Sequence, residues 1–158
     1  MLRKLLTQTS LPVHGFITQL DRTSPDYSLY IYPAQLPDKE RRKDLENRLG
    51  SNPGKQNLDE FAAKFEELAL PLISDLPDGG VIVMDELGVL ESRAKGFTEK
   101  VLDILSEDRP IIIVIKDRQG VPFLDKLRSL SDFKHIRVTR ENRDRLFEEL
   151  APVVRNWK

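Results

Sequence analysis

Two adjacent carboxylates, Asp85 and Glu86, directly follow the apolar run VIVM. A run of this kind indicates a strand buried inside a parallel sheet, and ligands of such sheets gather at the carboxyl ends of the strands. One carboxylate at such a place can hold a hard cation such as Mg²⁺, and its neighbour can orient or deprotonate a water molecule. The same two acids can also simply cap the helix that follows, so the pair alone supports both interpretations equally.

Helices and strands are expected to alternate along the chain and to bring these groups together. The predicted strands are VHGFITQL, YSLYIYPA, VIVM, IIIVI and HIRV. Helices are predicted at Met1–Gln8, after a cap at Asn57, from Phe97 to Leu105, over VPFLDKLRSL and after a cap at Thr139. Strands separated by helices favour an α/β fold, with a mostly parallel sheet covered by helices on both faces.

The charged run from Asp38 to Arg48 predicts an exposed helix or a mobile excursion, ended by GSNPG. Lys116 follows the run IIIVI, again at the carboxyl edge of the predicted sheet. There it could approach a base or a phosphate group, or it could lie in a solvated loop.

Composition narrows the possible partners. The 158 residues include 25 Lys and Arg against 26 Asp and Glu, so no overall basic field attracts nucleic acid or an anionic membrane. The chain has no cysteine, which excludes disulfides and thiolate metal sites and fits a reducing cytoplasm. No segment approaches the roughly 20 apolar residues of a membrane-spanning helix. We therefore expect one cytoplasmic domain over residues 1–158.

Several segments resemble, in the same order, the bacterial branch of the nucleoside-triphosphatase family first described from thermophilic bacteria, which has the P-loop fold. The matching segments are Gly15-Phe16, LYIYPA, GKQNLDEF, DELGVLE, Phe97, RPIIIVIK and VTRENR. The resemblance covers nearly the whole chain, which makes it more specific than any one motif.

This resemblance implies a Walker B role for the two acids, in which Asp85 holds Mg²⁺ and Glu86 activates water. It also implies that Glu91 braces the Asp-Glu turn or the water shell of the metal, although an exposed glutamate at a helix entry is the alternative. Asn142 and Arg143 fall in the VTRENR segment and are candidate nucleotide-binding residues, together with Lys116. Thr139 with Asn142 also suits an ordinary helix start.

The sequence departs from the family at one place. Members begin with a strand and the phosphate-binding loop G-x-x-x-x-G-K-[ST], and here the chain begins at MLRKLL, which resembles the helix after that loop. The string GSNPGKQ is one residue too short between its glycines and has Gln56 where a hydroxyl belongs. We therefore expect a sheet without its first, central strand, with a gap beside VIVM, in a chain that is N-terminally incomplete.

The resulting hypothesis is a Mg²⁺-dependent nucleoside-triphosphatase acting on ATP or GTP, with weak or no activity in this chain alone. The alternative is a non-catalytic pseudo-NTPase that binds a protein partner along the opened sheet.

Overall fold

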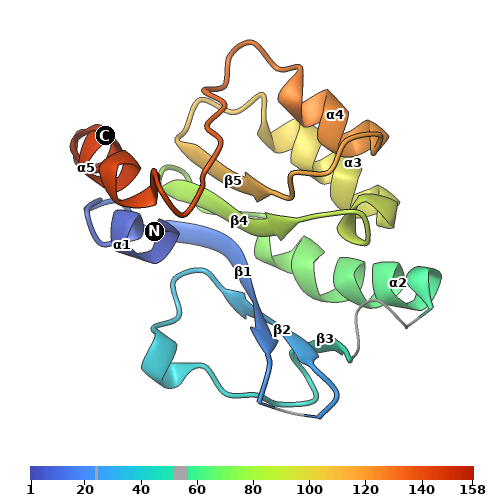
Figure 1. Cartoon of the computed structure of the whole chain (residues 1–158). Helices are drawn as coiled ribbons and strands as arrows, with labels where there is room; N and C mark the ends of the chain where they lie inside the picture. Colours follow the sequence, from blue (N-terminus) through green and yellow to red (C-terminus); the bar gives the residue numbers. More distant parts are fainter. Residues whose placement is uncertain (24, 52–56) are drawn as a thin grey trace.

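The computed structural model describes residues 1–23, 25–51 and 57–158, and its core is a five-stranded sheet in the order β3-β2-β1-β4-β5 (Figure 1). The strands are β1 (Val13–Asp21), β2 (Ser28–Pro33), β3 (Arg48–Gly50), β4 (Val81–Leu87) and β5 (Ile111–Ile115). The helices are α1 (Leu2–Leu6), α2 (Leu58–Ala69), α3 (Lys95–Ile104), α4 (Pro122–Arg128) and α5 (Arg143–Arg155).

The sheet is mixed but mostly parallel. β1, β4 and β5 pair in parallel, whereas β2 pairs antiparallel with both β1 and β3. Four of the five strands therefore point the same way and β2 alone runs against them. This confirms the predicted α/β class, including the pairing of the first two predicted strands as neighbours.

Both faces of the sheet are covered by helices. On one face, α1 and the Trp157 side chain pack against the buried side chains of Val81 and Val83, and α5 packs against α1. On the other face, α2, α3 and α4 enclose the larger apolar cluster. Figure 1 shows the two groups of helices on opposite sides of β4.

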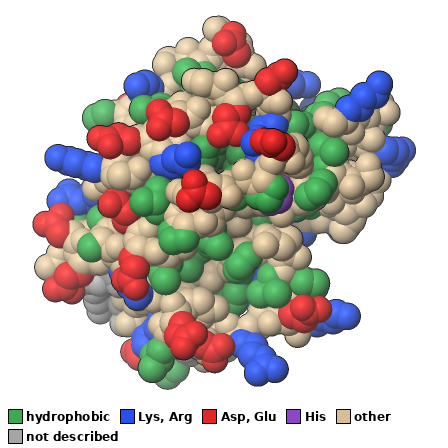
Figure 2. All heavy atoms as spheres, turned by 180° about the vertical axis from the view of Figure 1, so that it is seen from behind, with side chains coloured by type: hydrophobic (Ala, Val, Ile, Leu, Met, Phe, Trp, Pro, Cys, Tyr) green, Lys and Arg blue, Asp and Glu red, His purple; other side chains and the backbone are tan. Residues whose placement is uncertain are grey.

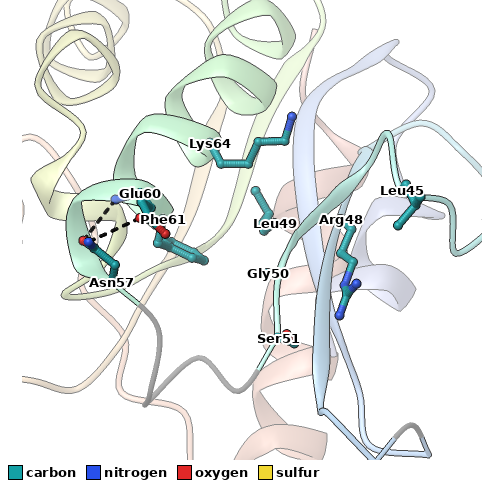
Figure 3. A pocket seen from close by; sticks show the side chains of 9 residues that line it. All are labelled: Leu45, Arg48, Leu49, Gly50, Ser51, Asn57, Glu60, Phe61 and Lys64. Atoms are coloured by element: carbon teal, nitrogen blue, oxygen red, sulfur yellow. Dashed lines mark hydrogen bonds between the residues drawn. The ribbon is translucent and has the colours of Figure 1, made fainter.

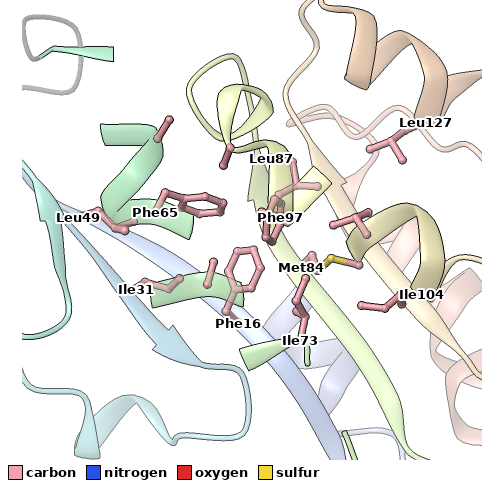
Figure 4. Close-up of a cluster of buried hydrophobic side chains, with 14 of the residues drawn as sticks. Phe16, Ile31, Leu49, Phe65, Ile73, Met84, Leu87, Phe97, Ile104 and Leu127 are labelled. Atoms are coloured by element: carbon pink, nitrogen blue, oxygen red, sulfur yellow. The ribbon is translucent and has the colours of Figure 1, made fainter. Parts of the chain in front are cut away.

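Three phenylalanines from three elements form the centre of the larger cluster. Phe16 of β1, Phe65 of α2 and Phe97 of α3 lie edge to face, with ring centroids 4.8–5.8 Å apart (Figure 4). Each ring is fully buried. Phe97, which opens the helix after the acidic turn in the resemblance, therefore fixes α3 against the sheet.

Local signals in the sequence account for the start of α2. The Asn57 side chain accepts hydrogen bonds from the backbone N–H groups of Asp59 (2.9 Å) and Glu60 (3.4 Å), which confirms the predicted cap. The final helix differs from its prediction, because its cap position is Asn142 and Thr139 belongs to the turn that precedes it.

Two secondary-structure elements that the sequence predicts are not formed, the first being the helix that was one of the two alternatives for the charged run. The charged run after Asp38 forms one short 3-10 turn, Asp38–Glu40, and then an irregular segment that ends in β3. Its charges bond locally: Arg41 pairs with Asp38 and donates to the Leu36 carbonyl, while Asn47 bonds the backbone of residues 42 and 44. These side-chain bonds to turns compete with helix formation. The string GSNPGKQ lies partly outside the described residues, which exclude 52–56.

The segment HIRV is the second error, since it is not a strand. Residues 135–138 belong to no helix or strand, and Val138 is 49% exposed. A short apolar-polar alternation forms a strand only where a neighbour accepts its hydrogen bonds, and no described strand lies beside this segment.

The expected gap beside VIVM is likewise absent, because β4 is paired on both sides. It bonds β1 through Val81–Asp85 and β5 through Ile82–Leu87. Within the described residues, the two edge strands are β3 and β5, and the five apolar residues of β5 are all half-buried. In a strand, the backbone N–H groups of successive residues point to opposite sides. The Lys116 N–H group points toward β4, where it donates to the Leu87 carbonyl oxygen, so the N–H groups of Ile111, Ile113 and Ile115 point to the open edge.

The face opposite to that of Figure 1 carries interspersed acidic and basic side chains, with no field of one sign (Figure 2). Among the described helices, none combines the length and apolar character that crossing a bilayer requires.

Gly15 is required by the close approach of β1 to β4. It has φ +93°, and a Cβ at this position would overlap the Val83 carbonyl oxygen. We expect Gly15→Ala to lower the free energy of unfolding by more than about 3 kcal/mol, measured by chemical denaturation. Gly120→Ala is the matched control, because Gly120 also has a positive φ (+74°) but open space around it. Its loss should be only about 1 kcal/mol, and equal losses in the two variants would contradict the role of the clash.

Candidate functional site

The acidic pair lies where β4 leaves the sheet. Alternation along the strand places Asp85 on the same face as Val81 and Val83, which is the face covered by α1. Asp85 is opposite Ile17 in the register with β1, and its peptide bond to Glu86 is cis. The carboxylate is therefore carried by the middle strand of the parallel group, at its carboxyl end.

The Asp85 carboxyl group lies in an environment that disfavours its charge. Burial, and next to it the neighbouring Glu86, raise the pKa of Asp85 from 3.8 to about 6, against a lowering effect of Arg3 and the amino terminus. Among the described residues, no side chain or backbone group donates a hydrogen bond to this carboxylate. A desolvated, unpaired acid of this kind is typical of a ligand site.

Glu86 differs, because it has a cationic partner. Lys116 Nζ lies 3.2 Å from Glu86 Oε1, and both side chains are largely exposed. The Lys116 backbone N–H also donates to the Leu87 carbonyl oxygen at 2.8 Å. The structure thus brings together the predicted residues Asp85, Glu86 and Lys116 at adjacent strand ends.

Glu91 lies inside this turn and is only 6% exposed, so the interpretation as an exposed glutamate at a helix entry is wrong. Its Oε2 accepts the Gly88 backbone N–H at 2.9 Å. Burial raises the pKa of Glu91, while the charge of Lys116 and the hydrogen bond from Gly88 oppose this. The geometry is that of a brace which closes the loop after Asp85 and Glu86.

Asn142 and Arg143 have no described contact with the acidic pair. The Asn142 amide accepts a hydrogen bond from Thr139 N–H (2.8 Å) and donates one to the Arg137 carbonyl (2.8 Å), so it holds the turn before α5. The Arg143 guanidinium is 60% exposed and lies 3.7 Å from Asp144. Their nucleotide role remains a prediction.

Arg3 was not predicted from the sequence. It lies on α1, pairs with Asp38 at 2.6 Å, and its charge lowers the pKa of Asp85. The only signal in the sequence was the position of Arg3 on a helix that, in the resemblance, corresponds to the one after the phosphate loop of the family. Its approach to Asp85 depends on α1 packing over the end of β4.

The carboxylates present suit a hard divalent cation. Asp85 offers oxygen ligands that have no hydrogen-bond partner among the described residues. A bound cation would also offset the repulsion between the Asp85 and Glu86 carboxylates. Within the described part of the chain, no cluster of three or more His, Asp or Glu side chains could form a metal site by itself. Water and substrate oxygens would have to complete the coordination, as they usually do for Mg²⁺.

A cavity of about 370 Å³ lies elsewhere, between β3 and the first turns of α2 (Figure 3). Leu49 and Phe61 point toward it, and Asn57, Glu60 and Lys64 line it from α2. None of the residues of the acidic turn borders this cavity. No functional role is assigned to it.

The architecture, with two acids at the carboxyl end of β4, is an α/β fold of the kind that binds ligands at this edge of the sheet. A solved structure with the same arrangement is the crystal structure of THEP1 from the hyperthermophile Aquifex aeolicus, with a TM-score of 0.73 and 22% identity. The match covers 96% of this chain and 88% of that one. At this identity the likeness shows the fold alone.

Sequence comparison supplies the family. A family model described as NTPase matches residues 1–151. The cancer-related nucleoside-triphosphatase homolog of Mus musculus is 30% identical over 176 aligned positions, covering 97% of this chain and 86% of the mouse protein. The chain therefore belongs to the NTPase family, within the P-loop superfamily, and membership implies a nucleotide ligand.

Other relatives match over less of their length. The nucleoside-triphosphatase THEP1 of Methanocaldococcus jannaschii is 32% identical, covering 48% of this chain and 41% of the relative. The human cancer-related nucleoside-triphosphatase is 33% identical over 58% of this chain and 53% of its own length. The chain thus spans about half of these two relatives.

We expect Asp85→Asn to stabilise the protein at neutral pH. Because the pKa of Asp85 is raised to about 6 in the folded state, the charged form is disfavoured above pH 6, and this penalty disappears as the pH falls toward 3.8. Thermal unfolding should show a gain of roughly 1–3 kcal/mol at pH 7.5 that shrinks to near zero at pH 4. Asp103→Asn, on the exposed side of α3, is the control and should lack this pH dependence. A variant that is less stable than the parent at pH 7.5 would contradict the environment described for Asp85.

Proposed function

We propose that this chain carries the metal- and water-handling part of a Mg²⁺-dependent nucleoside-triphosphatase that converts ATP or GTP to the diphosphate and phosphate. The observation that carries the proposal is the desolvated, unpaired Asp85 beside Glu86 at the carboxyl end of a strand buried on both faces. In P-loop enzymes this Walker B position serves the metal and the attacking water. The proposal includes a cytoplasmic location, where free nucleoside triphosphates are available.

Each residue of the turn has a distinct role in this proposal. The Asp85 carboxylate holds the metal ion, directly or through water, and Glu86 orients a water molecule and accepts its proton. When bound, Mg²⁺ supplies electrostatic stabilisation of the charge on the phosphate oxygens. Glu91 keeps the turn closed through the Gly88 N–H group. Water attacks the γ-phosphorus, and the nucleoside diphosphate leaves as the bond to its β-phosphate oxygen breaks.

Lys116, Asn142 and Arg143 are the candidate contacts to the nucleotide. Lys116 is favoured by its position at the end of β5, next to Glu86. Asn142 is less favoured, because both ends of its amide already bond the turn before α5. The Arg143 guanidinium, at the start of that helix, is exposed and has a long ion pair with Asp144 (3.7 Å), so it is accessible to a phosphate or a base.

The proposal also requires groups that bind the phosphates of the nucleotide. The 158 residues of the chain contain no G-x-x-x-x-G-K-[ST] string, so we expect little or no hydrolysis by the chain alone. The open edge of β5 supports a place for one further parallel strand, which could carry such a loop. An all-apolar strand of this kind is typical of the sheet interior.

The same open edge favours the second candidate, a non-catalytic pseudo-NTPase that docks a protein partner. The outward N–H groups of β5 would pair with a strand of that partner, which would also cover the half-buried isoleucines of β5. This alternative needs neither Asp85 nor Glu86 for activity.

Phosphate release separates the two candidates. We would measure Mg²⁺-dependent release from ATP and GTP by the 158-residue chain and by a form lengthened with any upstream strand and phosphate loop in the coding sequence. The lengthened form should hydrolyse both nucleotides, and Glu86→Gln should lower kcat by at least about 100-fold, because the water loses its base. Glu99→Gln, an exposed change on α3, is the control and should retain full activity.

Activity of the short chain that Glu86→Gln abolishes would show that phosphates are held without a P-loop, contrary to the expectation above. Activity that Glu86→Gln leaves unchanged would contradict the role of Glu86. No release from either form would favour the pseudo-NTPase.

A further inference from the structure

The two adjacent carboxylates differ in their partners. Glu86 Oε1 lies 3.2 Å from the Lys116 ammonium, whereas Asp85 has no hydrogen bond or ion pair to any described residue. A divalent cation attracts both carboxylates, and two neighbouring acids can both become its ligands. If Asp85 is to bind the metal and Glu86 is to act on the water molecule, an interaction must therefore keep Glu86 from coordinating the metal.

Lys116 is firmly placed for such a task. Its backbone N–H donates to the Leu87 carbonyl at 2.8 Å, and its own carbonyl accepts from Arg128 Nη2 at 2.7 Å. Arg128 is in turn fixed by Asp125 on α4, at 2.9 Å. The main chain of Lys116 is thus tied both to the acidic turn and to a helix.

The side chain of Lys116 crosses directly over Gly88. A Cβ on Gly88 would come within 3.0 Å of the Lys116 Cδ atom and within 3.0 Å of Glu91 Oε2. The absence of a side chain at Gly88 leaves room for the lysine stem, which brings its ammonium group to Glu86. The Lys116 side chain therefore packs against the turn that carries Glu86 and Gly88.

We propose that Lys116 is a positioning residue that holds Glu86 away from the metal, which leaves Asp85 as the only carboxylate ligand. The inference rests on the proposed function, since it assumes that the cation binds at Asp85. With the ammonium on one Glu86 oxygen, the carboxylate stays beside the metal site, where it can meet a water molecule.

The ion pair itself contributes little to stability, because Lys116 and Glu86 are 57% and 42% exposed. Lys116→Met keeps the unbranched stem over Gly88 and removes only the charge, so this variant should fold. Lys116→Arg keeps the charge and is the matched control. Lys116→Gln is a second neutral variant.

The test measures Mn²⁺ binding to the full chain without nucleotide. Free Mn²⁺ is followed by electron paramagnetic resonance, and broadening of the backbone amide signals around Asp85 identifies the site. Lys116→Met should bind Mn²⁺ about tenfold more tightly at this site, because a nearby positive charge is lost and Glu86 is released to the ion. Lys116→Gln should behave alike, and Lys116→Arg should stay within about twofold of the parent.

The double variant Lys116→Met with Glu86→Gln isolates the positioning effect. Glu86→Gln alone should change the affinity less than about threefold, whereas in the Lys116→Met background it should remove most of the gain. If the double variant binds as tightly as Lys116→Met, or if Lys116→Met does not tighten binding, the positioning role is overturned. A purely structural role of Lys116 would lower the melting temperature without tightening metal binding.

Asp85→Asn tests the underlying assumption separately. It should weaken Mn²⁺ binding and abolish the local broadening. If the broadening persists unchanged in this variant, or is absent from the parent, the metal assignment of the proposed function fails. If Asp85→Asn weakens Mn²⁺ binding but Lys116→Met leaves the affinity unchanged, only the positioning inference is overturned.

Discussion

The double burial of β4 is the constraint on which the rest of the structure depends. This strand bonds β1 on one side and β5 on the other, and its residues Val81–Met84 are wholly inaccessible to solvent. Such a strand can tolerate no polar side chain along its length. The first position where acids can stand is its carboxyl end, and Asp85 and Glu86 occupy that position.

Packing around the strand then gives each acid its own environment. α1 covers the face that carries Asp85, which removes water and brings Arg3 within electrostatic reach. β5 ends beside the turn and supplies Lys116 to Glu86. Glu91 folds back beneath both and binds the Gly88 N–H group. Residues from four separate parts of the chain thus meet at one edge of the sheet, where ligands of open α/β sheets usually bind.

The open edge of β5 is a place in the described structure where the composition of a strand and its pairing disagree. Ile111–Ile115 has the composition of an interior strand but has a single partner among the described strands. The error over HIRV also concerns pairing, since an apolar-polar alternation forms a strand only beside a neighbour that it can bond. Both features concern hydrogen bonds to a strand that the described chain does not contain, and neither can be read from periodicity.

The sequence by itself determined the elements whose signals are local. Apolar runs marked β4 and β5, Asn57 marked the start of α2, and the position of the acids after VIVM placed them at the carboxyl end of β4. Only the tertiary structure decided what those acids contact: the burial of Glu91, the approach of Arg3, the pairing of Lys116 with Glu86 and the separation of Asn142 from this turn. The physical reason is that periodicity and capping depend on residues a few positions apart, whereas charge environments depend on side chains brought together by packing. The charged run after Asp38 shows the same limit, because its charges bond turns and neighbouring strands that no helical pattern reveals.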